Sequence, residues 1–167
     1  MLRILGLDPG LRHTGWGVIE KDGTRLRFIA GGVINPIETG ELANRLADLH
    51  QNLKQIIELY QPDEAAVEQT FVNNNPTSTL KLGQARGVVL LTPALYQISV
   101  AEYTPNQIKK MIVGAGHADK KQVDMMVRTL LKTVPEKIPA DASDALAIAL
   151  CHSFMRPTNL NKMMLNR

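Results

Sequence analysis

The first 34 residues contain three strand-like segments in succession, and this pattern constrains the fold more than any other feature of the chain. Residues 2–8 form an apolar run that predicts a buried strand, and residues 15–20 and 25–34 predict two more strands. Asp22-Gly23 stands between the last two segments, and Asp-Gly is a strong hairpin signal. We therefore predict that the three strands form an antiparallel meander.

The next segment predicts a helix that crosses over the sheet. Apolar side chains between residues 41 and 60 follow one helical stripe, and Gln61-Pro62 marks its end. Residues 64–68 then predict a short strand. Because a strand reached through a helical crossover pairs in parallel, this strand should lie parallel to an earlier one.

The second half of the chain predicts four helices and one strand. Gly83 and Gly87 allow close approach on one face of the first of these helices, and Pro93 predicts a break or kink in it. The last helix is apolar on most sides, which is typical of a helix buried against a sheet. The predicted segments are helices 77–96, 105–113, 119–131 and 141–154 and strand 98–103.

The whole order predicts an α/β fold. Its mixed five-stranded sheet has strands 1–3 antiparallel and strands 4–5 parallel, with helices on both faces. A length of 167 residues suits one compact domain, which we place at residues 1–155, with a short polar tail at 156–167.

Composition excludes several classes of protein. The single cysteine, Cys151, rules out an internal disulfide and a paired-cysteine metal motif, and we expect it to be a small buried side chain. No apolar run reaches membrane-spanning length. Asp8 and Pro9 interrupt the first apolar segment, so it does not predict a signal peptide, and we expect a cytoplasmic protein.

Charge is unevenly distributed, although the formal net charge is only +3. Residues 71–132 contain eight Lys and Arg against three acids, whereas residues 38–68 contain seven acids against two basic residues. This polarity indicates a cationic face for a polyanion, and an ordinary solvated surface is an equal alternative.

Four carboxylates stand at the ends of predicted elements. Asp8 follows the first strand, Glu68 closes the fourth, and Asp141 and Asp144 open the last helix three residues apart. Neighbouring parallel strands end on the same edge of a sheet, so this set can converge there. Carboxylates this close repel one another unless cations neutralise them, and an oxygen-only ligand set selects Mg²⁺ or Mn²⁺ over Zn²⁺.

Each acid also has a structural interpretation. Asp8-Pro9-Gly10 fits a tight turn and Glu68 fits a solvated strand end. Asp141 fits a helix N-cap, and the helix dipole favours Asp144 near the same helix end. Together these interpretations are less convincing than separately, because all four acids stand where one sheet edge can gather them. Paired metal ions are a known device for phosphodiester cleavage, and with a cationic face they point to a nuclease.

Five short segments, in order along the chain, identify a known family. They are residues 5–10 (LGLDPG), 14–17 (TGWG), 67–71 (VEQTF), 80–87 (LKLGQARG) and 141–147 (DASDALA). With them the chain resembles the RuvC family of crossover junction endodeoxyribonucleases, the bacterial Holliday junction resolvases, over nearly its whole length. The resemblance implies a ribonuclease H-like fold and Mg²⁺-dependent cleavage of four-way DNA junctions by a homodimer, for use in recombination and repair.

The resemblance also assigns residues. Asp8, Glu68, Asp141 and Asp144 match the family's catalytic, metal-binding carboxylates, for which it implies two Mg²⁺ ions with Mn²⁺ as a substitute. Phe71 matches an aromatic that engages bases at the junction centre, and Lys109 and Lys120 match lysines near the scissile phosphate. Lys110 and Lys121 are adjacent and leave open which lysine of each pair acts. The other candidate DNA-binding residues are Lys81 and Arg86, and the implied partner is the RuvA–RuvB branch-migration complex.

Three other functions remain as alternatives. A second ribonuclease H-like family, which processes ribosomal RNA precursors, shares the early Asp-x-Gly strand but not the segment at residues 80–87. A kinase or ATPase of the actin type needs two domains, and 167 residues supply one. A junction-binding protein without catalysis would need the acids to be only caps and turns. No role is assigned to His13, His50, His117 or His152.

Overall fold

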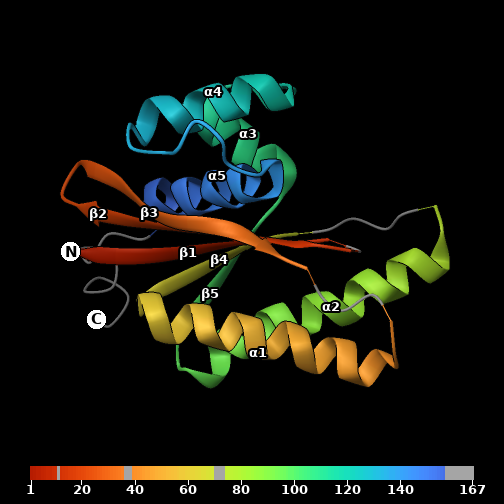
Figure 1. Cartoon of the computed structure of the whole chain (residues 1–167). Helices are drawn as coiled ribbons and strands as arrows, with labels where there is room; N and C mark the ends of the chain where they lie inside the picture. The colour runs from red at the N-terminus through yellow and green to blue at the C-terminus, as the bar shows by residue number, and fades with distance from the viewer. Residues whose placement is uncertain (11, 36–38, 70–73, 157–167) are drawn as a thin grey trace, which may run out of the picture.

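The computed structural model describes residues 1–10, 12–35, 39–69 and 74–156, and shows one sheet between two helical layers (Figure 1). Its strands are β1 (Leu2–Pro9), β2 (Thr14–Asp22), β3 (Arg25–Ile34), β4 (Glu64–Glu68) and β5 (Ser99–Tyr103). Its helices are α1 (Leu42–Tyr60), α2 (Pro76–Leu95), α3 (Pro105–Val113), α4 (Lys120–Leu130) and α5 (Ala140–Met155). No helix within these ranges is both long and apolar enough to cross a membrane.

The strand order in the sheet is β3-β2-β1-β4-β5. The meander β1–β2–β3 is antiparallel, and β4 pairs in parallel with β1 and with β5. The predicted mixed sheet is therefore confirmed, including the direction of every strand pair. The central position of β1 puts the end of the first apolar segment in the middle of one sheet edge.

Helix α5 lies directly against β1 and β2, and α3 and α4 cover it from outside, while α1 and α2 cover the opposite face (Figure 1). Glycine makes the close approach of α5 possible. A Cβ built on Gly6 would overlap the carbonyl oxygen of Ala145, so only glycine fits this position of β1. Cys151 on α5 is fully buried, as expected.

Alternation along the strands decides which side chains face α5. In β1, Ile4 belongs to the core on the α5 side, whereas Leu5 and Leu7 belong to the core under α1 and α2. Since successive side chains point to opposite faces, Asp8 shares the face of Ile4. In β4, Ala66 is in the α5-side core, so Glu68 faces α5 as well.

Two structural interpretations of the acids are wrong, and so is the predicted break at Pro93. Asp8 is not a turn residue, because β1 continues to Pro9 and Asp8 pairs with Gly15 of β2. Asp141 is not an N-cap, because Pro139 holds that position. Pro93 does not interrupt α2, because it lies in the last turn before the helix ends at Leu95.

Two other predictions concern segments at the margin of the described chain. Arg156, the first residue of the predicted polar tail, is held to the domain, since its guanidinium pairs with Glu64, 2.5 Å between Nη2 and Oε1. The rest of the predicted tail, residues 157–167, and the candidate base-stacking residue Phe71 lie outside the described residues.

Candidate active site

Asp8 and Glu68 lie side by side at the edge where β1 and β4 end. The parallel register pairs Leu7 with Val67, so the next residue on each strand is one of the two acids. The two carboxyl groups share a hydrogen bond. Both acids line a cavity of about 280 Å³ with residues of α3, α4 and α5.

The first turn of α5 adds Asp141 and Asp144 to this edge. One carboxylate oxygen from each of Asp8, Asp141 and Asp144 lies within 4.8 Å of the other two. Gly15 permits this approach, because a Cβ built on it would overlap the carbonyl oxygen of Asp141. The strand partner of Asp8 is thus the residue that lets the first turn of α5 come close to Asp8.

The electrostatics of the cluster show an excess of negative charge. Burial, the largest cause, and the neighbouring Glu68, Asp144 and Asp141 together raise the pKa of Asp8 to about 8. Burial likewise raises the pKa of Glu68. Since a divalent cation favours the ionised forms, the cluster fits a hard cation bound by oxygen ligands.

Two lysines face the acids. Lys120 donates a hydrogen bond from Nζ to Oδ2 of Asp144 over 3.1 Å, and this bond raises the pKa of Lys120. Lys109 lines the same cavity, and its charge lowers the pKa of Glu68 against the effect of burial. Lys110 and Lys121 do not line this cavity, although Lys121 borders a neighbouring groove of about 530 Å³ along α4.

The remaining candidate DNA-binding residues lie elsewhere. Arg86 donates to the backbone carbonyl of Glu68 and pairs with Glu102, so it supports the end of β4 from within the fold. Lys81 borders a small pocket between α1 and α2 that also contains Arg45. Lys109 and Lys120 therefore line the cavity of the acids, whereas Lys81 does not and Arg86 contacts the backbone of Glu68.

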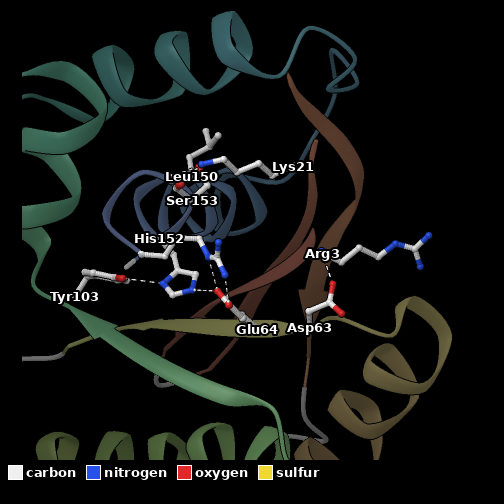
Figure 2. Close-up of polar contacts among 9 residues, drawn as sticks. Arg3, Lys21, Asp63, Glu64, Tyr103, Leu150, His152 and Ser153 are labelled. Carbon is white, nitrogen blue, oxygen red and sulfur yellow. Dashed lines mark hydrogen bonds and ion pairs between the residues drawn. The ribbon is translucent and has the colours of Figure 1, made fainter. Parts of the chain in front are cut away.

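His152, a buried residue of α5, forms a polar network that the sequence did not predict. His152 is 5% exposed; one ring nitrogen, Nδ1, lies 2.7 Å from the Tyr103 hydroxyl and the other, Nε2, lies 2.7 Å from Oε2 of Glu64 (Figure 2). Arg156 holds the same carboxylate, and lowers the pKa of Glu64 to about 2. This network ties α5 to β4 and β5. The sequence signal for it is a histidine inside an otherwise apolar buried helix.

A second polar contact that the sequence did not indicate joins α4 to the first turn of α5. Ser143 donates from Oγ to Oδ1 of Asp124 over 2.6 Å. Nothing in the local pattern of either residue predicts the contact, since the two lie 19 positions apart in the sequence.

The arrangement has the parts needed to hydrolyse a phosphodiester. Acidic oxygens from three elements surround a position suited to divalent cations, and two ammonium groups stand beside them. Cation sites of this kind activate water and stabilise a leaving oxygen, and ammonium groups bind phosphate.

Comparison with known proteins agrees with this geometry. A family model described as "Crossover junction endodeoxyribonuclease RuvC" matches residues 4–152. A protein of that name from Azorhizobium caulinodans is 58% identical over 157 residues, which are 93% of this chain and 92% of the relative. Another from Rhodopseudomonas palustris is 57% identical over 155 residues, 93% of this chain and 88% of the relative.

A solved structure, described as T. thermophilus RuvC in complex with Holliday junction substrate, has the same fold. It superposes with a TM-score of 0.85 at 32% identity, and the match covers 92% of this chain and 94% of that one.

Proposed function

The chain belongs to the RuvC family of crossover junction endodeoxyribonucleases, and we propose that it resolves four-way DNA junctions by cutting two symmetrically placed phosphodiester bonds. The observation that carries this proposal is the convergence of Asp8, Glu68, Asp141 and Asp144 beside Lys109 and Lys120. The T. thermophilus relative in complex with a Holliday junction supports the choice of substrate. Cleavage of this kind serves recombination and repair.

The four carboxylates would hold Mg²⁺, two ions at each site, with Mn²⁺ able to replace it. The bound cations would supply an activated water and an electrostatic partner for the leaving oxygen. The four acids fit Mg²⁺, because they offer only oxygen ligands. Burial and mutual repulsion raise the pKa of Asp8, and a bound cation would relieve that repulsion.

The side chains themselves position the substrate. Lys109 on α3 and Lys120 on α4 both line the cavity, where their ammonium groups bind phosphate oxygens and stabilise developing negative charge. Burial and the neighbouring acids raise the pKa of Asp8, so its carboxyl group would have to lose a proton for the four acids to hold a cation. Helices α3 and α5 exclude water from the apolar side of the cavity through Ile108, Ala147 and Ile148.

Other residues contribute to DNA binding at a distance from the cut. We assign backbone contacts to Lys81, Lys110 and Lys121, and base stacking at the junction centre to Phe71. For Arg86 the contacts to Glu68 and Glu102 favour a structural role over a phosphate contact.

A homodimer matches the two-fold symmetry of a four-way junction and of its two cuts. Helix α2 offers a face for it: Leu80, Leu91 and Leu95 are 64%, 55% and 62% exposed. Gly83 and Gly87 share this helix, and a Cβ built on either would meet open space. We assign the dimer contact to this α2 face, defined by these five residues.

The same function implies three further assignments. The protein would act with the RuvA–RuvB complex, which moves the junction, and it would work in the cytoplasm, where chromosomal DNA is accessible. Residues 1–155 would form the nuclease domain.

The decisive experiment offers purified protein a synthetic four-way junction and, separately, a linear duplex of the same sequence. We expect symmetric nicks in the junction with Mg²⁺, none in the duplex, and none with Asp8→Asn, which should still bind the junction. Cleavage of single-stranded RNA in place of the junction would support the ribosomal RNA-processing alternative, and ATP hydrolysis would support the actin-type alternative. Normal cutting by Asp8→Asn would contradict the metal-site assignment.

A further inference from the structure

The first turn of α5 carries two of the four acids but lacks a capping side chain. Its N-cap residue, Pro139, makes no side-chain hydrogen bond to the turn. A helix end leaves its first N–H groups without helical partners, and Asp141 and Asp144 repel each other on one face. The turn therefore needs support from another element if both carboxylates are to stay in place.

Helix α4 supplies that support through one side chain. Asp124 accepts the Ser143 hydroxyl at Oδ1 over 2.6 Å and Nε of Arg128 at Oδ2 over 2.9 Å. Arg128 in turn donates from Nη1 to the Pro135 carbonyl over 3.1 Å. We call these contacts the Asp124 clamp: Asp124, Arg128, Ser143 and the Pro135 carbonyl. The clamp holds both the first turn of α5 and the segment that leads into it.

The clamp lies directly beside a site contact. Lys120 and Asp124 are four residues apart and share a face of α4, while Ser143 and Asp144 are adjacent in α5. The Lys120–Asp144 and Asp124–Ser143 pairs therefore join the two helices at consecutive turns.

Helix α4 itself is well fixed at this end. Asp119 and Gln122 form a reciprocal capping box at its start, and Val123 and Val127 are buried in the core beneath α5. Ser143 is only 5% exposed, so water competes little for its hydroxyl. Since α4 is fixed by its own cap and core contacts, it can hold the first turn of α5 in place.

We propose that Asp124 is a positioning residue of the carboxylate site: through Ser143 and Arg128 it fixes the first turn of α5, so that Asp141 and Asp144 keep their oxygens near Asp8. This role rests on the proposed function, because it matters only if the acids hold cations. Asp124 does not line the cavity that contains Asp8 and Glu68 but borders the neighbouring groove along α4, so it acts on the acids through Ser143.

The physical consequence concerns cation affinity. Carboxylates that bind a cation need placement within about 0.5 Å, and partners that orient such ligands change metal affinity or activity by about 10- to 100-fold. Without the clamp, the backbone bond from Ser143 N to Pro139 O, 3.0 Å, would remain to hold this turn.

The test compares Ser143→Ala and Asp124→Ala with Thr129→Ala, which removes a hydrogen bond inside α4 (Thr129 Oγ1 to Met125 O, 2.8 Å) but none between helices. Mn²⁺ affinity is measured by calorimetry without DNA, and amide hydrogen exchange is followed in the first turn of α5. We expect about tenfold weaker Mn²⁺ binding and faster exchange for both clamp variants, and wild-type values for the control. The double variant should bind Mn²⁺ no more weakly than Asp124→Ala alone, since Asp124→Ala already removes the bond that Ser143→Ala breaks.

Single-turnover junction cleavage over a Mg²⁺ series separates the two proposals. The clamp predicts that Ser143→Ala needs several-fold more Mg²⁺ for half its maximal rate while junction binding stays unchanged. Wild-type Mn²⁺ affinity and wild-type exchange in Ser143→Ala would overturn the clamp and leave the proposed function intact. A wild-type protein that leaves junctions uncut would overturn the proposed function, whatever the clamp variants do.

Discussion

The carboxyl group of Asp8 shares a hydrogen bond with that of Glu68 across the ends of two neighbouring parallel strands. Burial and three nearby acids raise the pKa of Asp8 to about 8, against 3.8 for an ordinary aspartate. Lys109 and Lys120 face these acids, and a bound cation would add further positive charge that favours their ionised forms.

The first prediction concerns pH and stability in protein stripped of divalent metal. Between pH 4 and pH 8 the folded state keeps a proton on Asp8 that the unfolded chain releases, so stability falls as pH rises and levels off above about 8. Asp8→Asn removes this dependence. At pH 8 without metal it should be more stable than wild type by at least 1 kcal/mol, roughly 3 °C in Tm.

Thermal melts at several pH values, with and without Mg²⁺, check this prediction. Mg²⁺ should raise the Tm of wild type more than that of Asp8→Asn. An Asp8→Asn variant that melts below wild type at pH 8 would show that Asp8 stabilises the fold by itself.

The second prediction uses the adjacent lysines as matched pairs. Lys109 and Lys120 line the cavity with the acids, whereas Lys110 and Lys121 do not. Lys109→Ala and Lys120→Ala should slow single-turnover junction cleavage by about 100-fold, as expected for loss of a group that stabilises developing charge. Lys110→Ala and Lys121→Ala should weaken DNA binding slightly, with little effect on the rate at saturation. Equal losses within a pair would contradict this division.

The third prediction concerns Gly15. An added methyl group would overlap the Asp141 carbonyl, so Gly15→Ala must shift the first turn of α5 away from β2. We expect a loss of about 1–3 kcal/mol in stability and cleavage reduced by at least about tenfold. Gly116→Ala is the control, because its Cβ would approach no neighbour closer than 4.0 Å. Full activity in Gly15→Ala would mean that the exact position of this turn is unimportant.

The fourth prediction concerns the buried network around His152. Arg156 and His152 hold the pKa of Glu64 at about 2, so its contribution to stability is complete above the unfolded value of 4.5 and is lost as pH falls toward 2. Glu64→Gln should cost about 2 kcal/mol at pH 7. Melting curves from pH 7 to pH 2 should show the two proteins converging below pH 4.5. A constant difference over the whole range would rule out the ionised carboxylate as the cause.

The fifth prediction tests the α2 face. Leu91→Arg places a charge on the proposed dimer contact and should convert the protein to a monomer in sedimentation experiments at micromolar concentration. Leu59→Arg is the control, because Leu59 is even more exposed than Leu91, at 71% against 55%, but lies on α1. A dimer that survives Leu91→Arg and dissociates with Leu59→Arg would move the interface to α1.

Periodicity and turn chemistry determined the elements of this fold. The helix at residues 105–113 and the strands at 25–34 and 64–68 follow from local patterns alone. Apolar residues that recur with a period of 3.6 or of 2 indicate a helix or a strand directly in the sequence. The crossover rule was enough to predict that the strand ending at Glu68 is parallel to the strand ending at Asp8.

Local patterns failed where a longer-range contact outweighed a propensity. Asp-Pro-Gly favours a turn, but pairing with β2 keeps Asp8 and Pro9 in the sheet. Asp141 has the chemistry of an N-cap, but the helix begins earlier, at Ala140. Which lysine of each adjacent pair faces the acids depends on how α3 and α4 pack on α5. Two identical residues side by side carry no local signal that distinguishes them.

The sequence by itself thus determined the order of elements, the mixed sheet and the four acids that its parallel edge can gather. Tertiary structure alone decided which lysines face those acids, that Gly15 admits the Asp141 turn, and that Asp124 and His152 tie α5 to its neighbours. The physical reason is the separation along the chain over which each kind of interaction acts. Backbone preference and burial period act over a few residues, whereas these contacts join residues 19 to 126 positions apart, such as Ser143 with Asp124 and Asp141 with Gly15, and exist only once α5 has packed.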